Sequence, residues 1–494
     1  MKILFITVPY HAGVVEVAGK WVPLYMVTLA GACREAGFEC HIYDAMTKGV
    51  GMAEVERQIR DLQPDVVAVS MITSTTPDAL EVLRSARRLC PAVVTVAGGI
   101  HASFMYDEIM AHDFVDYLVV GEGEKTLVEL LLSLGGGEQE AVAGLALRDS
   151  EGKVKLTSPR PLLTSLDNMP MAWDLLDWQD YTYFIIPGSR LGAVAFSRGC
   201  TYSCRFCSQH KFWGQWRART PEDLMGEIRR LYEDFQVNVI LFTDDYPTPD
   251  RQRWERLLDL LIEADLPVYL LMETRAADII RDSDILDKYR RAGFIHIYIG
   301  SEAASQERLD LFAKEQSCSQ AEEAMELCRR HDIITETSVI IGLPADTRES
   351  IQEIIRYTQK LNPDFAHFLT ISPWPYADMY PELKPFISSY DYRRYNLVDP
   401  VLKPQNMTLD EVDEIIIQAY REFYMAKFTE IMTMSDFKRR YMLTAIMRIM
   451  NNSFLRRKMG DMSAAMPESM RAALTELQSG LTPRNDVQLK VSAP

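Results

Sequence analysis

Three cysteines stand at C-x3-C-x2-C spacing in the segment 197–207, which reads SRGCTYSCRFC. They are Cys200, Cys204 and Cys207, and the loop that carries them directly follows the apolar run 193–196. Thiolates are the donors that iron–sulfur clusters take, and a cluster of four irons needs four ligands. The segment supplies three ligands, so it predicts a 4Fe-4S cluster with one iron left open to another molecule.

A structural zinc site is the alternative for this segment, with His210 as the fourth ligand of a Cys3His set. No second C-x2-C pair lies nearby, and a long α/β pattern follows rather than a small metal-stabilised knuckle. The spacing rules therefore favour the iron–sulfur cluster.

The composition is that of a globular protein with two or three domains: 494 residues, 47% hydrophobic and 25% charged. The formal net charge of -17 argues against nucleic-acid binding, because phosphate backbones are held by an excess of lysine and arginine. Eight cysteines are too few for a disulfide scaffold, so a reducing cytoplasm fits best. No uninterrupted apolar run is long enough to span a bilayer. A small molecule or a protein is the favoured partner.

Strand-like and helical segments alternate over residues 1–137, which predicts a doubly wound parallel sheet of the Rossmann or flavodoxin type. Ligands of such sheets bind in the crevice beyond the carboxyl ends of the strands. The expected strands are 3–8, 39–43, 66–70, 93–97 and 117–120, and the expected helices include 24–35 and 78–89. Their carboxyl-end loops are small and polar, so a ligand is expected there.

A linker at 138–189 contains an expected strand pair, 143–147 and 153–157, and several prolines. Six more strand and helix units follow within 190–404, which predicts a partial (β/α)6 barrel with its active face at the carboxyl ends of the strands. The expected strands are 193–197, 239–243, 268–273, 295–300, 336–342 and 365–372. The expected helices are 221–234, 250–264, 285–292, 319–331 and 348–361.

Polar residues follow these barrel strands, and they include Asp244, Asp245, Arg275, Glu302 and the turn at Gly342. An ion pair with Asp278 is the structural alternative for the arginine. Aromatic residues also cluster at the barrel mouth, namely Trp213, Trp374 and Tyr376. They could lie against a broad, flat, apolar substrate, or they could close the barrel as a hydrophobic cap.

The region 405–494 is expected to be helical, with helices at 409–425 and 438–457. The second helix carries an apolar stripe at helical spacing, surrounded by lysine and arginine. Such a helix can close the barrel core or touch an anionic membrane surface, and a methionine-rich stripe favours packing. The tail 479–494 is expected to be mobile.

The cysteine spacing, with Phe206 before the last cysteine, resembles the signature of radical S-adenosylmethionine (SAM) enzymes. This resemblance implies SAM at the open iron, with Glu302 and the Gly342 turn as contacts. Arg275 is the candidate for the SAM carboxylate, since its fork of donors suits that group. The G-G-E motif that the family carries after the second strand is missing. Thr243-Asp244-Asp245 stands there, which makes Asp245 the candidate in its place.

The loops of the first domain resemble a cobalamin-binding domain, whose motifs are D-x-H-x-x-G, S-x-L and G-G. The segments 44–49 (DAMTKG), 70–72 (SMI) and 98–99 (GG) match in that order. Met46 stands where the family's histidine ligand would lie, and a thioether is a weaker ligand for cobalt, so cobalamin is expected without histidine ligation. The resemblance implies cobalamin contacts from Tyr10, Asp44, Met46, Gly49, Ser70, Thr73, Gly98, Gly99, Gly121 and Glu122.

Most of residues 1–430 resembles one subgroup, the anaerobic oxidative cyclases that act on magnesium-protoporphyrin IX monomethyl ester in bacteriochlorophyll synthesis. The segments that carry this likeness are 10–13, 16–21, 44–47, 207–213, 300–304 and 374–376. The resemblance implies a radical that removes hydrogen from a propionate side chain, then oxidation, entry of water-derived oxygen and closure of the isocyclic ring. It also implies a tetrapyrrole substrate and a reduced flavodoxin- or ferredoxin-type electron donor.

Two other functions stay open. A cobalamin-dependent radical SAM methylase would use the same cofactors to carry a methyl group from SAM to an unactivated carbon. A metal- or cobalamin-sensing protein is the non-enzyme alternative, and an inability to turn SAM into 5'-deoxyadenosine under any reductant would support it.

Overall fold

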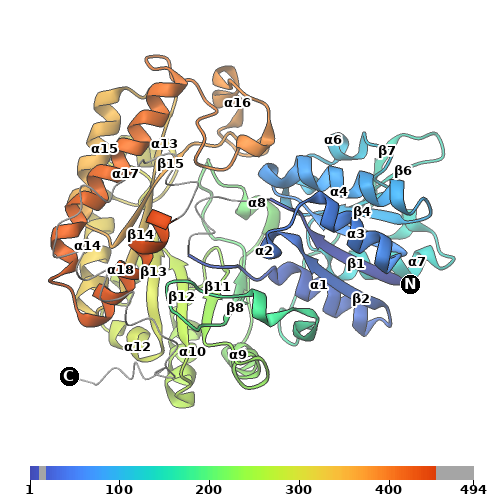
Figure 1. Cartoon of the computed structure of the whole chain (residues 1–494), viewed down its shortest axis with the longest axis horizontal. Coiled ribbons are helices and arrows are strands. Elements are labelled where there is room, and N and C mark those ends of the chain that lie inside the picture. The colour runs from blue at the N-terminus through green and yellow to red at the C-terminus, as the bar shows by residue number, and fades with distance from the viewer. Residues whose placement is uncertain (11–17, 452–494) are drawn as a thin grey trace.

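The computed structural model describes residues 1–10 and 18–451. Two α/β domains lie side by side, the first at the right of Figure 1 and the barrel at the left. The predicted helix end at Arg457 and the predicted mobile tail 479–494 lie outside the described residues, as does most of the segment 10–17.

The first domain is built on a seven-stranded sheet with the strand order β2-β1-β3-β4-β5-β6-β7. Its strands are β1 (Lys2–Thr7), β2 (Glu39–Asp44), β3 (Val66–Ser70), β4 (Val94–Gly98), β5 (Tyr117–Val119), β6 (Leu145–Arg148) and β7 (Val154–Leu156). Its helices are α1 (Leu24–Glu35), α2 (Ala45–Lys48), α3 (Met52–Leu62), α4 (Thr76–Leu89), α5 (Ile100–Phe104), α6 (Tyr106–Met110) and α7 (Gly123–Leu134). Strands β1 to β5 pair in parallel, which confirms the doubly wound sheet.

The strand pair that we placed in the linker belongs to this first sheet. β6 pairs antiparallel with β5, and β7 pairs antiparallel with β6. Leu145 and Ala146 are fully buried in the apolar layers of the first domain. A strand's alternating pattern shows that it has a buried face but does not show which sheet covers that face. Only the tertiary structure reveals the extension.

The barrel contains six parallel strands in the order β15-β14-β13-β12-β11-β8, which confirms the predicted partial barrel. The strands are β8 (Leu191–Val194), β11 (Val239–Phe242), β12 (Tyr269–Thr274), β13 (Phe294–Ile299), β14 (Ile334–Ile341) and β15 (Phe365–Thr370). The helices are α8 (Gln209–Trp213), α9 (Pro221–Phe235), α10 (Arg251–Ala264), α11 (Ala276–Arg281), α12 (Leu286–Arg291), α13 (Gln306–Leu311), α14 (Cys318–Arg330) and α15 (Arg348–Leu361). A short hairpin, β9 (Ser197–Arg198) and β10 (Arg217–Ala218), flanks the cysteine loop.

The helices around the barrel begin where the sequence supplies capping residues. Thr220 precedes Pro221 at the start of α9, and its hydroxyl accepts a hydrogen bond from the Asp223 amide. Ser317 and Gln320 form a capping box at the start of α14. Such caps satisfy the free amides of a first helical turn, which is why these starts could be predicted within a few residues.

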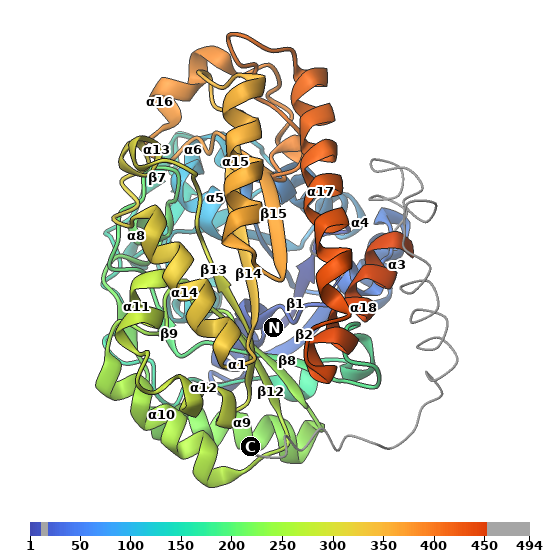
Figure 2. The ribbon, with the colours of Figure 1, turned by 90° about the vertical axis from the view of Figure 1, so that its left-hand side faces the viewer.

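Two helices complete the barrel after a short α16 (Tyr380–Leu383). α17 (Leu409–Ile431) packs along α15 and the open edge strand β15 (Figure 2). α18 (Asp436–Asn451) lies at the amino ends of the strands, where Lys438 forms an ion pair of 2.9 Å with Asp364. Its predicted stripe residues Met442, Ala445 and Ile446 are buried, as the packing interpretation expects. In the part of the chain that the structure describes, no helix is long and apolar enough to cross a membrane.

Candidate active site

The cysteine loop leaves the carboxyl end of β8. Cys204 is buried, and Cys200 and Cys207 are half-buried. Burial, together with the charges of Asp245, Cys204 and Cys200, raises the pKa of Cys207 to about 12. The backbone amide of Cys207 also donates to the carbonyl of Cys204 at 3.0 Å, which folds the loop tightly.

This donor set fits a four-iron cluster better than a single metal ion. Among residues 1–10 and 18–451, no three histidine, cysteine, aspartate or glutamate side chains gather closely enough to hold one ion. The zinc alternative with His210 needs such a gathering. A four-iron cluster instead binds each thiolate through a different iron, so its ligands spread over a wider space.

Phe206 and Arg275 hold the cysteine loop from two sides. The Phe206 ring packs edge-on against Phe312, with ring centroids 5.3 Å apart. The Arg275 guanidinium lies 3.5 Å from the centroid of the Tyr202 ring, inside the loop, and its Nη1 is 3.9 Å from Sγ of Cys204. Its Nη2 donates to the carbonyl of Glu315 at 3.1 Å. The arginine therefore lies beside a cluster ligand, and its contact with a SAM carboxylate stays a prediction.

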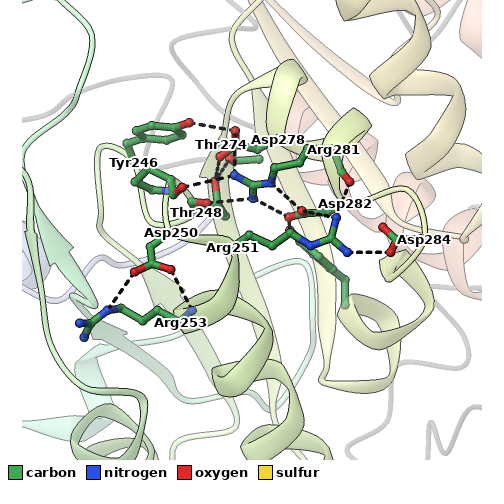
Figure 3. A network of polar contacts seen from close by, with 12 residues as sticks. Tyr246, Thr248, Asp250, Arg251, Arg253, Thr274, Asp278, Arg281, Asp282 and Asp284 are labelled. Carbon is green, nitrogen blue, oxygen red and sulfur yellow. Dashed lines mark hydrogen bonds and ion pairs between the residues drawn. The ribbon is translucent and has the colours of Figure 1, made fainter.

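The alternative partner of that arginine, Asp278, belongs to a separate network (Figure 3). Asp278 Oδ1 accepts from the Tyr246 hydroxyl at 2.9 Å, and Thr248 also donates to this carboxylate. Arg281 donates to the carbonyl of Thr248 at 2.9 Å. These bonds fasten the loop after β11 to α11, and that loop carries Asp245.

The two adjacent aspartates after β11 have different surroundings. Asp244 accepts from the Phe196 amide at 2.9 Å and from the Ser197 hydroxyl at 2.5 Å, so it anchors the root of the cysteine loop. The sequence alone assigns no role to Asp244, because adjacent acids look alike in a sequence. Asp245 lines a cavity, and burial together with the charge of Asp244 raises its pKa to about 7.

Glu302 and Gly342 lie beyond the carboxyl ends of β13 and β14. Glu302 has φ of 62°, an uncommon value for a residue other than glycine. Its Oε1 lies 2.9 Å from Nζ of Lys314, a partner that the sequence did not reveal. Gly342 has φ of 82°, and its amide donates to Asp346 at 2.8 Å. Both residues therefore lie at the predicted active face, where SAM binding stays a prediction.

A cavity of about 460 Å³ joins the first domain to the cysteine loop. From the first domain it is lined by Ser70, Gly98, Gly99, Gly121 and Glu122, together with the beginning of α1. From the barrel it is lined by Ser197, Arg198, Phe212, Trp213 and Asp245. The carboxyl ends of β3, β4 and β5 thus open onto the same space as the strand β9 that leads into the cysteine loop, and the three cysteines are not among the lining residues.

Two glycines leave room on the wall of this cavity. A Cβ atom at Gly121 would meet nothing within 4 Å, and one at Gly98 would come no closer than 3.7 Å to the Val119 carbonyl. Gly99 differs, because its Cβ would lie 2.5 Å from the Ser70 hydroxyl. Gly99 is therefore required by packing between strand ends, whereas Gly98 and Gly121 leave space for a flat ligand.

Comparison with known proteins agrees with this geometry. Residues 10–131 match the B12 binding domain and residues 194–358 match the radical SAM superfamily. The chain is 34% identical to the anaerobic magnesium-protoporphyrin IX monomethyl ester cyclase of Rubrivivax gelatinosus, over 94% of this chain and 84% of that protein. The chain belongs to the cobalamin-dependent radical SAM family. Its cofactors are accordingly a 4Fe-4S cluster, SAM and cobalamin.

Other members of the cobalamin-dependent radical SAM family are also similar to this chain. The hopanoid C-3 methylase of Methylococcus capsulatus is 26% identical over 81% of this chain and 76% of that protein. The structure of the methyltransferase TsrM from Kitasatospora setae aligns with a TM-score of 0.68 at 17% identity, covering 97% of this chain and all of that one. The shared fold therefore serves more than one reaction.

Glu122, whose contact with cobalamin stays a prediction, lines the cavity and also makes ionic contacts with the barrel domain. Its Oε1 accepts from Arg198 at 2.8 Å, and its Oε2 accepts from Arg217 at 2.9 Å and from the Leu163 amide at 2.9 Å. Arg198 and Arg217 belong to the β9–β10 hairpin around the cysteine loop. The Glu122 carboxylate therefore joins the loop after β5 to the β9–β10 hairpin. Both of its oxygens already accept hydrogen bonds.

The match of the segment 44–49 to the cobalamin motif also has a structural explanation. Asp44 caps α2, and its carboxylate accepts from the Thr47 amide at 3.1 Å, from Thr7 at 2.6 Å and from Tyr181 at 2.9 Å. Gly49 ends α2 in the left-handed region, with φ of 63°. Asp44, Met46 and Gly49 do not line the cavity. An aspartate and a glycine at this spacing are what a one-turn helix requires at its two ends.

Four further predicted residues, Tyr10, Thr73, Trp374 and Tyr376, lie outside the cavity lining. Tyr10 packs against the apolar core of the first domain. Thr73 is buried, with its hydroxyl 2.8 Å from that of Tyr376, so this pair docks the segment after β15 onto the first domain. Trp374 lies near Tyr395, with ring centroids 6.5 Å apart. Of the three aromatic residues predicted for the substrate, only Trp213 lines the cavity, and a substrate role stays a prediction for all three.

Proposed function

We propose that the chain is an anaerobic oxidative cyclase, which forms the isocyclic fifth ring of magnesium-protoporphyrin IX monomethyl ester in bacteriochlorophyll biosynthesis. The observation that carries this proposal is the similarity to the Rubrivivax gelatinosus cyclase along nearly the whole chain. The cavity between the strand ends of the first domain and the strand β9 that leads into the cysteine loop supports it, because the reaction needs both centres near one substrate.

The chain's own residues would position and protect this chemistry. Cys200, Cys204 and Cys207 would hold the cluster, and Arg275 would place a positive charge beside one of the thiolates. When bound, the cluster and SAM supply a radical that removes hydrogen from a substrate carbon. The barrel wall and the apolar floor below it would exclude water from that radical. A reducing cytoplasm suits this chemistry, with a reduced flavodoxin- or ferredoxin-type protein as the donor.

A cobalamin-dependent radical SAM methylase is the second candidate, acting on a tetrapyrrole or another apolar substrate. The methylase of Methylococcus capsulatus supports it, since that protein also matches most of this chain. A sensing role has less support, because the cyclase of Rubrivivax gelatinosus and the methylase of Methylococcus capsulatus, which match most of this chain, are both enzymes.

An anaerobic assay with methyl-labelled SAM and the porphyrin ester tests the proposal. The cyclase is expected to form the fifth ring and 5'-deoxyadenosine, with no label in the porphyrin. Label transferred to the porphyrin, without ring closure, would overturn the cyclase in favour of the methylase. Cys204→Ala protein, assayed in parallel, should form neither product.

A further inference from the structure

A segment after the last barrel strand contacts both the cysteine loop and the first domain. This bridging segment comprises residues 373–395, between β15 and α17, and it contains α16. Figure 1 shows α16 on the side of the barrel that faces the first domain. The described residues that line the cavity all lie outside this segment. The cavity therefore does not explain why the segment is held from two sides.

On one side, the bridging segment holds the cysteine loop. The amide of Met379 donates to the carbonyl of Arg205 at 3.1 Å, and Arg205 lies within the C-x2-C part of the motif. The Arg205 guanidinium also forms an ion pair with Glu382. Further along the chain, Lys211 of α8 donates to the carbonyl of Tyr376 at 3.0 Å. Because the first of these bonds joins main chain to main chain, the segment is tied to the backbone that carries the cluster ligands.

On the other side, the same segment contacts the chain that follows β3 and β4 of the first domain. The Tyr376 hydroxyl lies 2.8 Å from that of Thr73, which follows β3. The Tyr376 ring stacks on Phe104 of α5, with centroids 4.9 Å apart and an angle of 19° between the ring planes. Arg393 pairs with Asp78 of α4 at 2.9 Å. The segment therefore holds the edge of the sheet at which ligands of doubly wound domains bind.

The two sets of contacts meet at Tyr376. Its carbonyl accepts from Lys211, and its ring and hydroxyl contact the first domain. Thr73 is a fixed anchor for the hydroxyl, because it is fully buried and lies 3.1 Å from Nδ1 of His101, which is also fully buried. A phenol ring is rigid, and its side chain has few rotatable bonds. Tyr376 therefore transmits the position of the cysteine loop to the strand ends of the first domain.

Such a link matters because two cofactors have to act on one substrate. Reacting groups must meet almost at contact distance, and a misplacement of about 1 Å can lower a rate about 100-fold. The contact of Glu122 with Arg198 joins the two domains at the loop after β5. The contacts of the bridging segment lie at other strand ends of the same sheet, so they resist rotation of one domain about that first contact.

We propose that the bridging segment, acting through Tyr376 and Thr73, sets the separation between the 4Fe-4S cluster and cobalamin. Tyr376 is then a positioning residue, which holds the cysteine loop at a fixed distance from the strand ends of the first domain and touches neither cofactor. The role is the same for a cyclase and for a methylase, because either reaction uses both cofactors on one substrate. It therefore does not depend on the reaction proposed above.

Pulsed electron paramagnetic resonance of the reconstituted holoenzyme measures this separation. Cob(II)alamin and the reduced cluster each carry an unpaired spin, and the dipolar coupling between the spins gives the distribution of their distances. Tyr376→Phe and Thr73→Val remove the same hydrogen bond, so we expect each to broaden the distribution, and the double variant to equal the single ones. Tyr376→Ala, which also removes the stack on Phe104, should broaden it further. Iron and cobalamin contents should stay at the wild-type level in all of these variants.

Tyr390→Ala is the matched control, because Tyr390 lies in the same segment but is 61% exposed, and its distance distribution should equal that of the wild type. A role of Tyr376 in stability alone would lower the unfolding temperature and leave the distances in folded protein unchanged. A wild-type distribution in Tyr376→Phe and Thr73→Val, or an equal broadening in Tyr390→Ala, would overturn the proposal, even if Tyr376→Ala does not fold. Loss of bound cobalamin in Tyr376→Phe would also overturn it, because the hydroxyl would then be a cofactor contact.

Discussion

Oε1 of Glu122 lies 2.8 Å from Nη1 of Arg198, and this contact joins the two halves of the active site. Glu122 follows β5 in the first domain, and Arg198 lies two residues before Cys200. Both side chains are largely buried, with 5% and 12% of their surface exposed. The orientation of the first domain toward the cluster loop therefore depends on a short ionic contact.

Replacing this carboxylate should destabilise the protein. Glu122→Gln keeps the shape of the side chain but removes the charge that Arg198 and Arg217 share, and breaking one partner of a buried pair costs about 3–5 kcal/mol. We expect a loss of that order in the free energy of unfolding, measured by urea titration. Glu129→Gln, which breaks a pair with Arg160 whose carboxylate is 48% exposed, is the control and should cost less than about 1 kcal/mol. Equal losses of unfolding free energy in the two variants would contradict a stabilising role for the contact between Glu122 and Arg198.

The same contact should make stability depend on pH. Burial opposes ionisation of Glu122, but hydrogen bonds from Arg217, Leu163 and Arg198 hold its pKa below the ordinary value. A depressed pKa gives stability that is complete above the unfolded value of about 4.3 and is lost as pH falls through the folded value. The stability gap between wild type and Glu122→Gln should therefore stay constant above about pH 5 and narrow in more acidic buffer. A gap that widens in acid would refute this.

Removing a cluster ligand should abolish the cluster and leave the fold. Cys204→Ala should lose the brown absorbance and most of the bound iron, because a cluster held by two thiolates is not retained. Cys318→Ala, which changes a half-buried thiol elsewhere in the barrel, should keep the wild-type iron content. Iron analysis after anaerobic reconstitution measures both. Full iron in the Cys204 variant would remove the basis of the ligand assignment.

Filling the cavity wall should weaken cobalamin binding. A side chain at Gly98 fits its backbone and would project where a Cβ meets only ordinary contacts, so Gly98→Leu would occupy the cavity. We expect at least a tenfold weaker affinity, about 1.4 kcal/mol, from spectroscopic titration with cobalamin. Gly51→Leu, at an open position before α3, should bind like the wild type. Unchanged affinity in the Gly98 variant would place the corrinoid elsewhere.

An imidazole at position 46 should leave the cobalt environment unchanged. Met46 lies in α2 beyond the edge strand β2, and it does not line the cavity. The absorption spectrum of cobalamin bound to Met46→His protein is therefore expected to match that of the wild type. A shift toward a histidine-ligated spectrum would show that residue 46 reaches cobalt and that the cavity is not the corrinoid site.

Several features followed from the sequence because they depend on local chemistry. The spacing of the three cysteines gave the cluster loop, and apolar periodicity gave β3, α1 and α15 with the bounds that the structure shows. Gly98 and Gly121, which the resemblance assigns to cobalamin, line the cavity and leave space beside the strand ends, and their contact with cobalamin stays a prediction. The motif at Asp44 also has a local explanation, because the same residue types that bind a ligand cap a short helix, and its contact with cobalamin stays a prediction.

The sequence by itself determined the sulfur donors of the cluster loop and the hydropathy period of each helix and strand. The order of these elements along the chain then gave the order of the two domains. Only the tertiary structure decided which distant side chains meet. Glu122 faces Arg198 across 76 residues, and Glu336 lies between two histidines from neighbouring strands. A local sequence pattern cannot specify such pairs, because it indicates that a residue is buried but does not indicate which distant residue packs against it. Packing of the two sheets and closure of the barrel create these contacts.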